Sequence, residues 1–136
     1  MDELINKLYE KEDKKGFSSL SEVEKNIIVV STTLGAIDNG GLTDLCVNYS
    51  GNYINHIPQS FAAIGAQEAT ELLTKFVLWF GSIKPSKFRW FREIQFNYRY
   101  PKRSAEFDAI DDAWDSSALK IEQHLEQYIN ANYKQN

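Results

Sequence analysis

Apolar residues recur at helical spacing over most of this chain. Between residues 23 and 37 they follow one another at steps of 4, 3, 4 and 3, which places them on one face of a helix. Ser21 and Glu24 form a capping-box pattern just ahead of this stripe, and Asn39-Gly40 tolerates the left-handed conformation that ends many helices. The pattern therefore predicts a helix over residues 22–38. Its apolar stripe consists of Val23, Ile27, Val30, Leu34 and Ile37.

Similar spacing predicts further helices on both sides of this one. An amphipathic helix near the N-terminus ends before Gly16, and a short helix follows over residues 42–50. Pro58 fits a helix only in its first turn, so a new helix or a kink begins near it. Gly65 ends that helix. The next helix spans residues 66–80, and its run of apolar residues near the end indicates a central helix covered on most sides.

The last third of the chain is harder to interpret. In residues 82–103 aromatic side chains alternate with basic ones, but no partner strand is evident, and an isolated strand is not stable. We therefore expect helix or irregular structure packed by its aromatics and ended by Pro101. A short helix that includes Ile110 follows, and Ser116 or Ser117 caps a last helix.

These elements predict an all-α fold in a single compact domain, residues 1–136, of about six to eight short helices packed around 22–38 and 66–80. The apolar content of 43% excludes a disordered chain, and no apolar stretch approaches the roughly 18 residues of a membrane span. The start at Met1 lacks the pattern of a secretory signal. A single cysteine, Cys46, excludes an internal disulfide and is typical of a reducing compartment, so we expect a cytoplasmic protein without membrane contact.

Charge is distributed unevenly along the chain. The net charge is −4, yet residues 84–103 carry seven basic side chains against one acidic, a net of +6 within an otherwise acidic protein. The sequence pI near 5.2 disfavours direct nucleic-acid binding. We expect the aromatics of this block to be core residues, with basic stems extending over them.

No residue pattern indicates catalysis, a cofactor or a metal site. His56 and His124 have no partner at a metal-ligand spacing, and Cys46 lies on an apolar stripe as a buried, unreactive thiol would. The pair Gly40-Gly41 lacks the residues of a phosphate loop and indicates a chain reversal instead.

Four aspartates, Asp108, Asp111, Asp112 and Asp115, would share one face if they lie on a helix. Like charges at this spacing repel one another, so something must offset the cost. Solvation and a position near helix N-termini are one explanation. In a second explanation, Asp111 or Asp112 accepts a hydrogen bond from unpaired backbone amides at the Gly40-Gly41 corner. A partner, either a divalent cation or a basic protein surface, is the third.

Several short motifs in order resemble one protein family. They are Leu20-Ser21-x-x-Glu24, Asn39-Gly40-Gly41, Asn48-x-Ser50-Gly51, Ala63-Ile64-Gly65-Ala66 and Ile110-Asp111-Asp112. Together they resemble the bacterial DNA mimic protein nineteen-like domain over residues 20–83 and 105–130, within a family-like core of about 20–130. The resemblance implies an all-helical fold, an acidic surface that takes the DNA site of a regulator, and possible homodimers. The residues that carry the structural signature are Asn39, Gly40, Gly41, Asn48, Ser50, Gly51 and Gly65.

We therefore expect a non-enzymatic bacterial protein that presents an acidic face to another protein, such as a basic DNA-binding regulator. An immunity protein that neutralises a toxin is the alternative, because some relatives resemble immunity proteins. A hydrolase-type enzyme would need Asp111 or Asp112 to meet His56 or Asn39 in a cleft. The residues predicted to contact the partner are Asp108, Asp111, Asp112, Asp115, Glu122 and Glu126.

Overall fold

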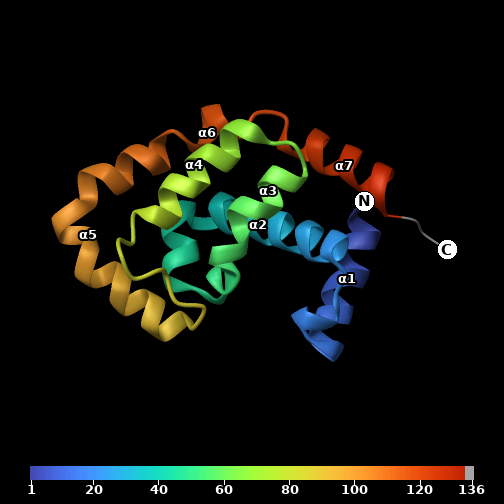
Figure 1. Ribbon diagram of the computed structural model, residues 1–136, viewed down its shortest axis with the longest axis horizontal. Coiled ribbons are helices and arrows are strands. Elements are labelled where there is room, and N and C mark those ends of the chain that lie inside the picture. Colours follow the sequence, from blue (N-terminus) through green and yellow to red (C-terminus); the bar gives the residue numbers. More distant parts are fainter. Residues whose placement is uncertain (134–136) are drawn as a thin grey trace.

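The computed structural model describes residues 1–133, and every regular element in that range is helical (Figure 1). Helix α1 spans Asp2–Lys15 and ends at Gly16, whose φ of 85° suits glycine. A 3₁₀ turn, η1 (Phe17–Ser19), leads into α2 (Glu22–Val47). The predicted capping box is present: Ser21 Oγ accepts from Glu24 N at 3.2 Å, and Glu24 Oε1 accepts from Ser21 N at 2.9 Å.

Helix α2 lies in the middle of the molecule and contacts α1, α3, α5 and α7. In its apolar stripe, Ile27, Val30 and Ile37 are buried, and Val23 and Leu34 are partly buried. Gly40 and Gly41 both have non-helical backbone angles and divide α2 into two helical segments. The predicted helix end near residue 38 and the short helix that follows from residue 42 are therefore confirmed.

Two 3₁₀ turns, η2 (Tyr49–Gly51) and η3 (Ile54–His56), follow α2. Helix α3 (Ile57–Ala63) carries Pro58 in its first turn, which confirms the predicted start. Gly65 ends this segment with a φ of 83°. Helix α4 (Gln67–Leu78) then buries Leu73 and Phe76. An exposed side that includes Glu71, Lys75 and Leu78 runs along the helix, so the expectation that it is covered on most sides is wrong.

Helix α5 (Arg89–Asp112) follows an irregular stretch and curves around one end of the molecule (Figure 1). The prediction of helix or irregular structure is confirmed, because residues 81–88 are irregular and the rest is helical. The expectation that Pro101 ends the segment is wrong: the helix continues past it and kinks at Arg103 (φ −133°). Trp79 Nε1 donates to the Arg103 carbonyl at 3.0 Å, which satisfies a group at the kink.

Two short helices complete the fold: α6 (Trp114–Ser117) and α7 (Ile121–Asn132). The predicted cap at Ser116 or Ser117 is wrong, because both residues lie inside α6. Lys120 precedes α7 instead, in the left-handed conformation with a φ of 62° and with no side-chain cap. The seven α-helices of residues 1–133 agree with the predicted all-α class and helix number.

One hydrophobic core joins all these helices. Beneath α5, Trp79 and Phe107 pack edge to face with ring centroids 4.9 Å apart, and Phe96 stacks on Tyr100 at 5.2 Å. Within residues 1–133 there is no helix whose length and apolar character would allow it to cross a membrane.

Candidate functional site

The break in α2 is built from two glycines. Gly40 has φ −154° and ψ 20°, and Gly41 has φ 69° and ψ −167°, a region of backbone space that is essentially restricted to glycine. The chain then resumes as a helix at residues 42–47. Because a new helical segment starts here, its first backbone amides have no partner within the segment.

Asp111 supplies that partner from another helix. Its Oδ1 accepts from Leu42 N at 2.9 Å, and the carboxylate is half-buried. A Cβ at Gly41 would lie 3.0 Å from the same oxygen, so glycine also leaves the space in which this carboxylate sits. The structure therefore confirms the explanation in which Asp111 caps the glycine corner.

Asp44 organises the remaining signature residues. Its Oδ1 accepts from Asn48 Nδ2 at 2.7 Å and from Asn39 Nδ2 at 3.2 Å, while Oδ2 accepts from Ser50 Oγ at 2.9 Å. These bonds tie both ends of the second segment of α2 to one buried carboxylate. The polar signature residues thus have partners inside the fold, which gives them a structural role.

Gly51 provides the closest backbone approach in the corner. A Cβ there would lie 1.7 Å from the Leu45 carbonyl oxygen and 2.8 Å from Arg92 Nε, so any side chain is excluded. Arg92 is itself fully buried. Its Nε donates to the Leu45 carbonyl at 2.8 Å, and Nη2 donates to the Asn48 carbonyl at 2.6 Å.

The burial of Arg92 corrects the expectation that basic residues of the 84–103 block only extend over a core surface. Burial lowers the pKa of this guanidinium, and it has no carboxylate in contact within the part of the chain described. Backbone carbonyls at the C-terminal end of α2 hold it instead, where the helix dipole favours a cation. No pattern in residues 84–103 indicates that one of the seven basic residues of this block is internal.

The aspartate row does not form one continuous helix face. Asp108, Asp111 and Asp112 lie in the last turns of α5, but α5 ends at Asp112, and Asp115 belongs to α6. The first three belong to the C-terminal end of α5, where the dipole of that helix disfavours a carboxylate. The suggested stabilisation near helix N-termini applies to Asp115 of α6 and to Asp111, whose carboxylate caps the helical segment that starts at Leu42. Asp108 accepts from Tyr100 Oη at 2.9 Å, which raises the pKa of that phenol.

The other predicted acidic residues lie on α7 and around an open depression. Glu122 and Glu126 are exposed and one helical turn apart. Glu122 and Asp115 line a depression of about 410 Å³, whose walls come from α2, α6 and α7. Asp38 of α2 lines it too, a residue that sequence reasoning missed because its neighbours in sequence indicated only a helix end.

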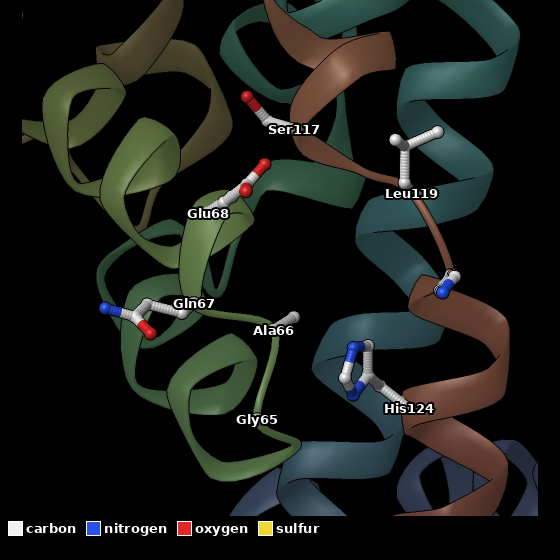
Figure 2. A pocket seen from close by; sticks show the side chains of 8 residues that line it. Gly65, Ala66, Gln67, Glu68, Ser117, Leu119 and His124 are labelled. Atoms are coloured by element: carbon white, nitrogen blue, oxygen red, sulfur yellow. The ribbon is translucent and has the colours of Figure 1, made fainter.

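A second depression has a volume of about 380 Å³ (Figure 2). Lys120 lines both depressions. Figure 2 shows Glu68 of α4, Ser117 of α6 and His124 of α7 around it. Gly65 lies at its edge, 3.8 Å from His124 Nδ1 when measured from an ideal Cβ position. This depression contains one acidic residue, so the acidic character is concentrated at the first one.

The residues considered for catalysis lie in separate contacts. His56 Nδ1 lies 2.9 Å from Ser60 Oγ, which is fully buried and donates to Asn26 Oδ1 at 2.9 Å. Among residues 1–133, no hydrogen bond or ion pair joins Asp111 or Asp112 to His56. Cys46 is fully buried, and burial raises the pKa of its thiol.

Comparisons with known proteins add one finding. Searches of curated proteins and of solved structures found no match to this chain. The family of DMP19-like proteins, however, matches residues 18–132, which include the glycine corner, α5 and all of α7. Because this match covers most of the sequence, the chain belongs to the DMP19-like protein family.

Proposed function

We propose that this protein is a non-enzymatic protein-binding module of the DNA-mimic type, which presents an acidic face to a basic partner. The face consists of Asp38, Asp112, Asp115, Glu122 and Glu126. The observation that carries the proposal is that Asp38, Asp115 and Glu122 come from three separate helices to one open depression. Membership of the DMP19-like family also supports a protein-binding role of the DNA-mimic type.

The chemistry of these residues favours a basic partner. All five carboxylates belong to exposed residues, and within the described range none of them forms an ion pair with a lysine, arginine or histidine. They are therefore available to cations of another molecule, such as the basic surface of a DNA-binding regulator. Asp111 is left out of this face because its carboxylate already accepts from Leu42 N.

The test is affinity capture of partners from the source cell at a series of salt concentrations. Contacts between exposed charges should weaken as the screening length falls from about 10 Å at 0.1 M to about 3 Å at 1 M. The double variant Asp115→Asn/Glu122→Gln should lose the captured protein. The matched control is Glu10→Gln/Glu71→Gln, which removes two exposed charges elsewhere and should retain it.

Two results would contradict the proposal. One is a captured partner that remains bound at about 1 M salt. The other is a partner that binds the Asp115→Asn/Glu122→Gln variant as well as it binds the unaltered protein.

A further inference from the structure

The first half of α5 and the loop before it carry a group of exposed apolar side chains. Tyr98 is 72% exposed and Ile83 69%, values that are unusual for residues of this size. The inner side of α5 is already occupied by Arg92, Phe96 and Phe107. The exposed members of the group are Ile83, Phe88, Trp90, Phe91, Ile94 and Tyr98, which we call the aromatic face.

Part of this face is hollow. Between the loop and α5 lies a groove of about 280 Å³, lined by Phe80, Ile83, Phe91 and Tyr98 on its apolar side. Phe91, Ile94 and Tyr98 follow one another at steps of 3 and 4, so they share one side of the helix. A contiguous apolar surface of this kind on a folded protein commonly marks an interaction site.

Arg99 lies in the wall of the groove, and Lys102 lies beside the groove residue Tyr98. The side chain of Arg99 is held in place because Nε donates to the Trp79 carbonyl and the guanidinium lies 5.7 Å from the centre of the Trp79 ring. Lys84, Lys87 and Lys102 lie on the same segments. In contrast to Arg89 and Arg103, which pair with Glu93 and Glu106, none of these four cations has an ion-pair partner within residues 1–133.

We propose that the aromatic face binds an acidic amphipathic segment of a partner protein, with an apolar side chain in the groove and carboxylates against Arg99 and Lys102. An apolar hollow with unpaired cations at its edge is complementary to a peptide that combines these two features. This surface is separate in sequence from the acidic face and has the opposite charge, so the proposal does not depend on the proposed function.

Other occupants fit less well. A two-fold contact with a second copy would place Lys84, Lys87 and Lys102 near their own counterparts. A single nucleic-acid strand needs free ring faces for stacking, but Lys102 Nζ lies 3.8 Å from the centre of the Tyr98 ring, and Trp90 packs edge to face on Phe91.

The test starts with a display library of short random peptides selected on the immobilised full-length protein. We expect the enriched peptides to combine Asp or Glu with an aromatic or branched apolar residue. One such peptide is then synthesised and titrated by calorimetry against the protein and its variants. Tyr98→Glu and Lys102→Glu should each weaken binding by about tenfold or more.

Matched control variants distinguish a loss of binding at the groove from a general effect of adding a negative charge to the surface. Leu119→Glu changes an equally exposed apolar residue on another part of the surface, and Lys14→Glu reverses an exposed charge on α1. Both should bind the peptide within about twofold of the unaltered protein, which is less than about 0.5 kcal/mol. Asp115→Asn/Glu122→Gln should also bind it normally, so failure of the acidic face and failure of this groove are distinguishable.

Several outcomes would overturn the inference. They are the absence of enriched peptides, enrichment of peptides without acidic residues, and peptide binding that is insensitive to Tyr98→Glu and Lys102→Glu. If anionic vesicles or oligo-dT bind the protein, and Tyr98→Glu and Lys102→Glu abolish that binding, the face would be assigned to a lipid or to a nucleic acid. Sedimentation that shows a dimer dissociated by Tyr98→Glu would assign it to a second copy.

Discussion

The contact between Asp111 and the glycine corner gives the sharpest prediction about stability. In the variant Asp111→Ala, Leu42 N loses the carboxylate that accepts from it at 2.9 Å. The neighbouring residue offers a matched control, because Asp112 is exposed, lies in the same last turn of α5, and its side chain forms no hydrogen bond with another described residue. The comparison of Asp111→Ala with Asp112→Ala therefore isolates this one bond.

The magnitude follows from the kinds of bond involved. A hydrogen bond to a charged group contributes about 1.5–3 kcal/mol, and loss of a side-chain cap at a helix start costs about 0.5–2 kcal/mol. Both variants gain similar helix propensity and lose similar repulsion from Asp108, so these effects nearly cancel in the comparison. We expect Asp111→Ala to be less stable than Asp112→Ala by about 1–3 kcal/mol.

The control should not lose stability. A carboxylate at a helix C-terminus is disfavoured by about 0.3–1 kcal/mol, so Asp112→Ala should be as stable as the unaltered protein or slightly more stable. The free energy of unfolding is measured by urea titration followed by far-ultraviolet circular dichroism. The slope of the free energy of unfolding against urea concentration should not change, because the surface exposed on unfolding stays the same.

A third variant tests the assignment of the bond. Asp111→Asn retains an oxygen that can accept from Leu42 N but removes the charge, so it should fall between the unaltered protein and Asp111→Ala. Equal stability of Asp111→Ala and Asp112→Ala would refute the reasoning. So would an Asp111→Asn variant that is as unstable as Asp111→Ala.

Two further predictions concern the same region. Gly51→Ala should lower the free energy of unfolding by about 3 kcal/mol or more, because the new Cβ would lie 1.7 Å from the Leu45 carbonyl oxygen. Gly35→Ala is the control in the same urea titration, because a Cβ at Gly35 would have no atom within 4 Å. Equal losses of stability in the two variants would contradict the close approach at Gly51. Cys46 should react with a thiol reagent such as DTNB only when the protein unfolds, because burial raises the pKa of the thiol and keeps the reagent away from it. Rapid labelling of the native protein at neutral pH would contradict this prediction.

The sequence by itself determined the helical class, the capping box at Ser21 and Glu24, and the start of α3 at Pro58. These features depend on residues close together in the chain, such as a hydroxyl three positions from a carboxylate, so local spacing is sufficient to predict them. The glycine corner was predicted for the same reason: consecutive glycines are found where the backbone must turn sharply.

Only the tertiary structure decided which polar residues are internal. Arg92 is buried and donates to the carbonyls of residues 45 and 48, and half-buried Asp111 accepts from the amide of residue 42. These contacts join parts of the chain more than forty residues apart. Asp38 lines the acidic depression with residues of α6 and α7, which are equally distant in sequence. Helix α5 continues past Pro101, and Trp79 Nε1 donates to the carbonyl at the kink that follows, a contact that local sequence does not indicate. Residue spacing within one segment predicts where a helix begins and which of its residues share a face. The packing of helices against one another determines which charged side chains are paired inside the fold and which remain free for a partner.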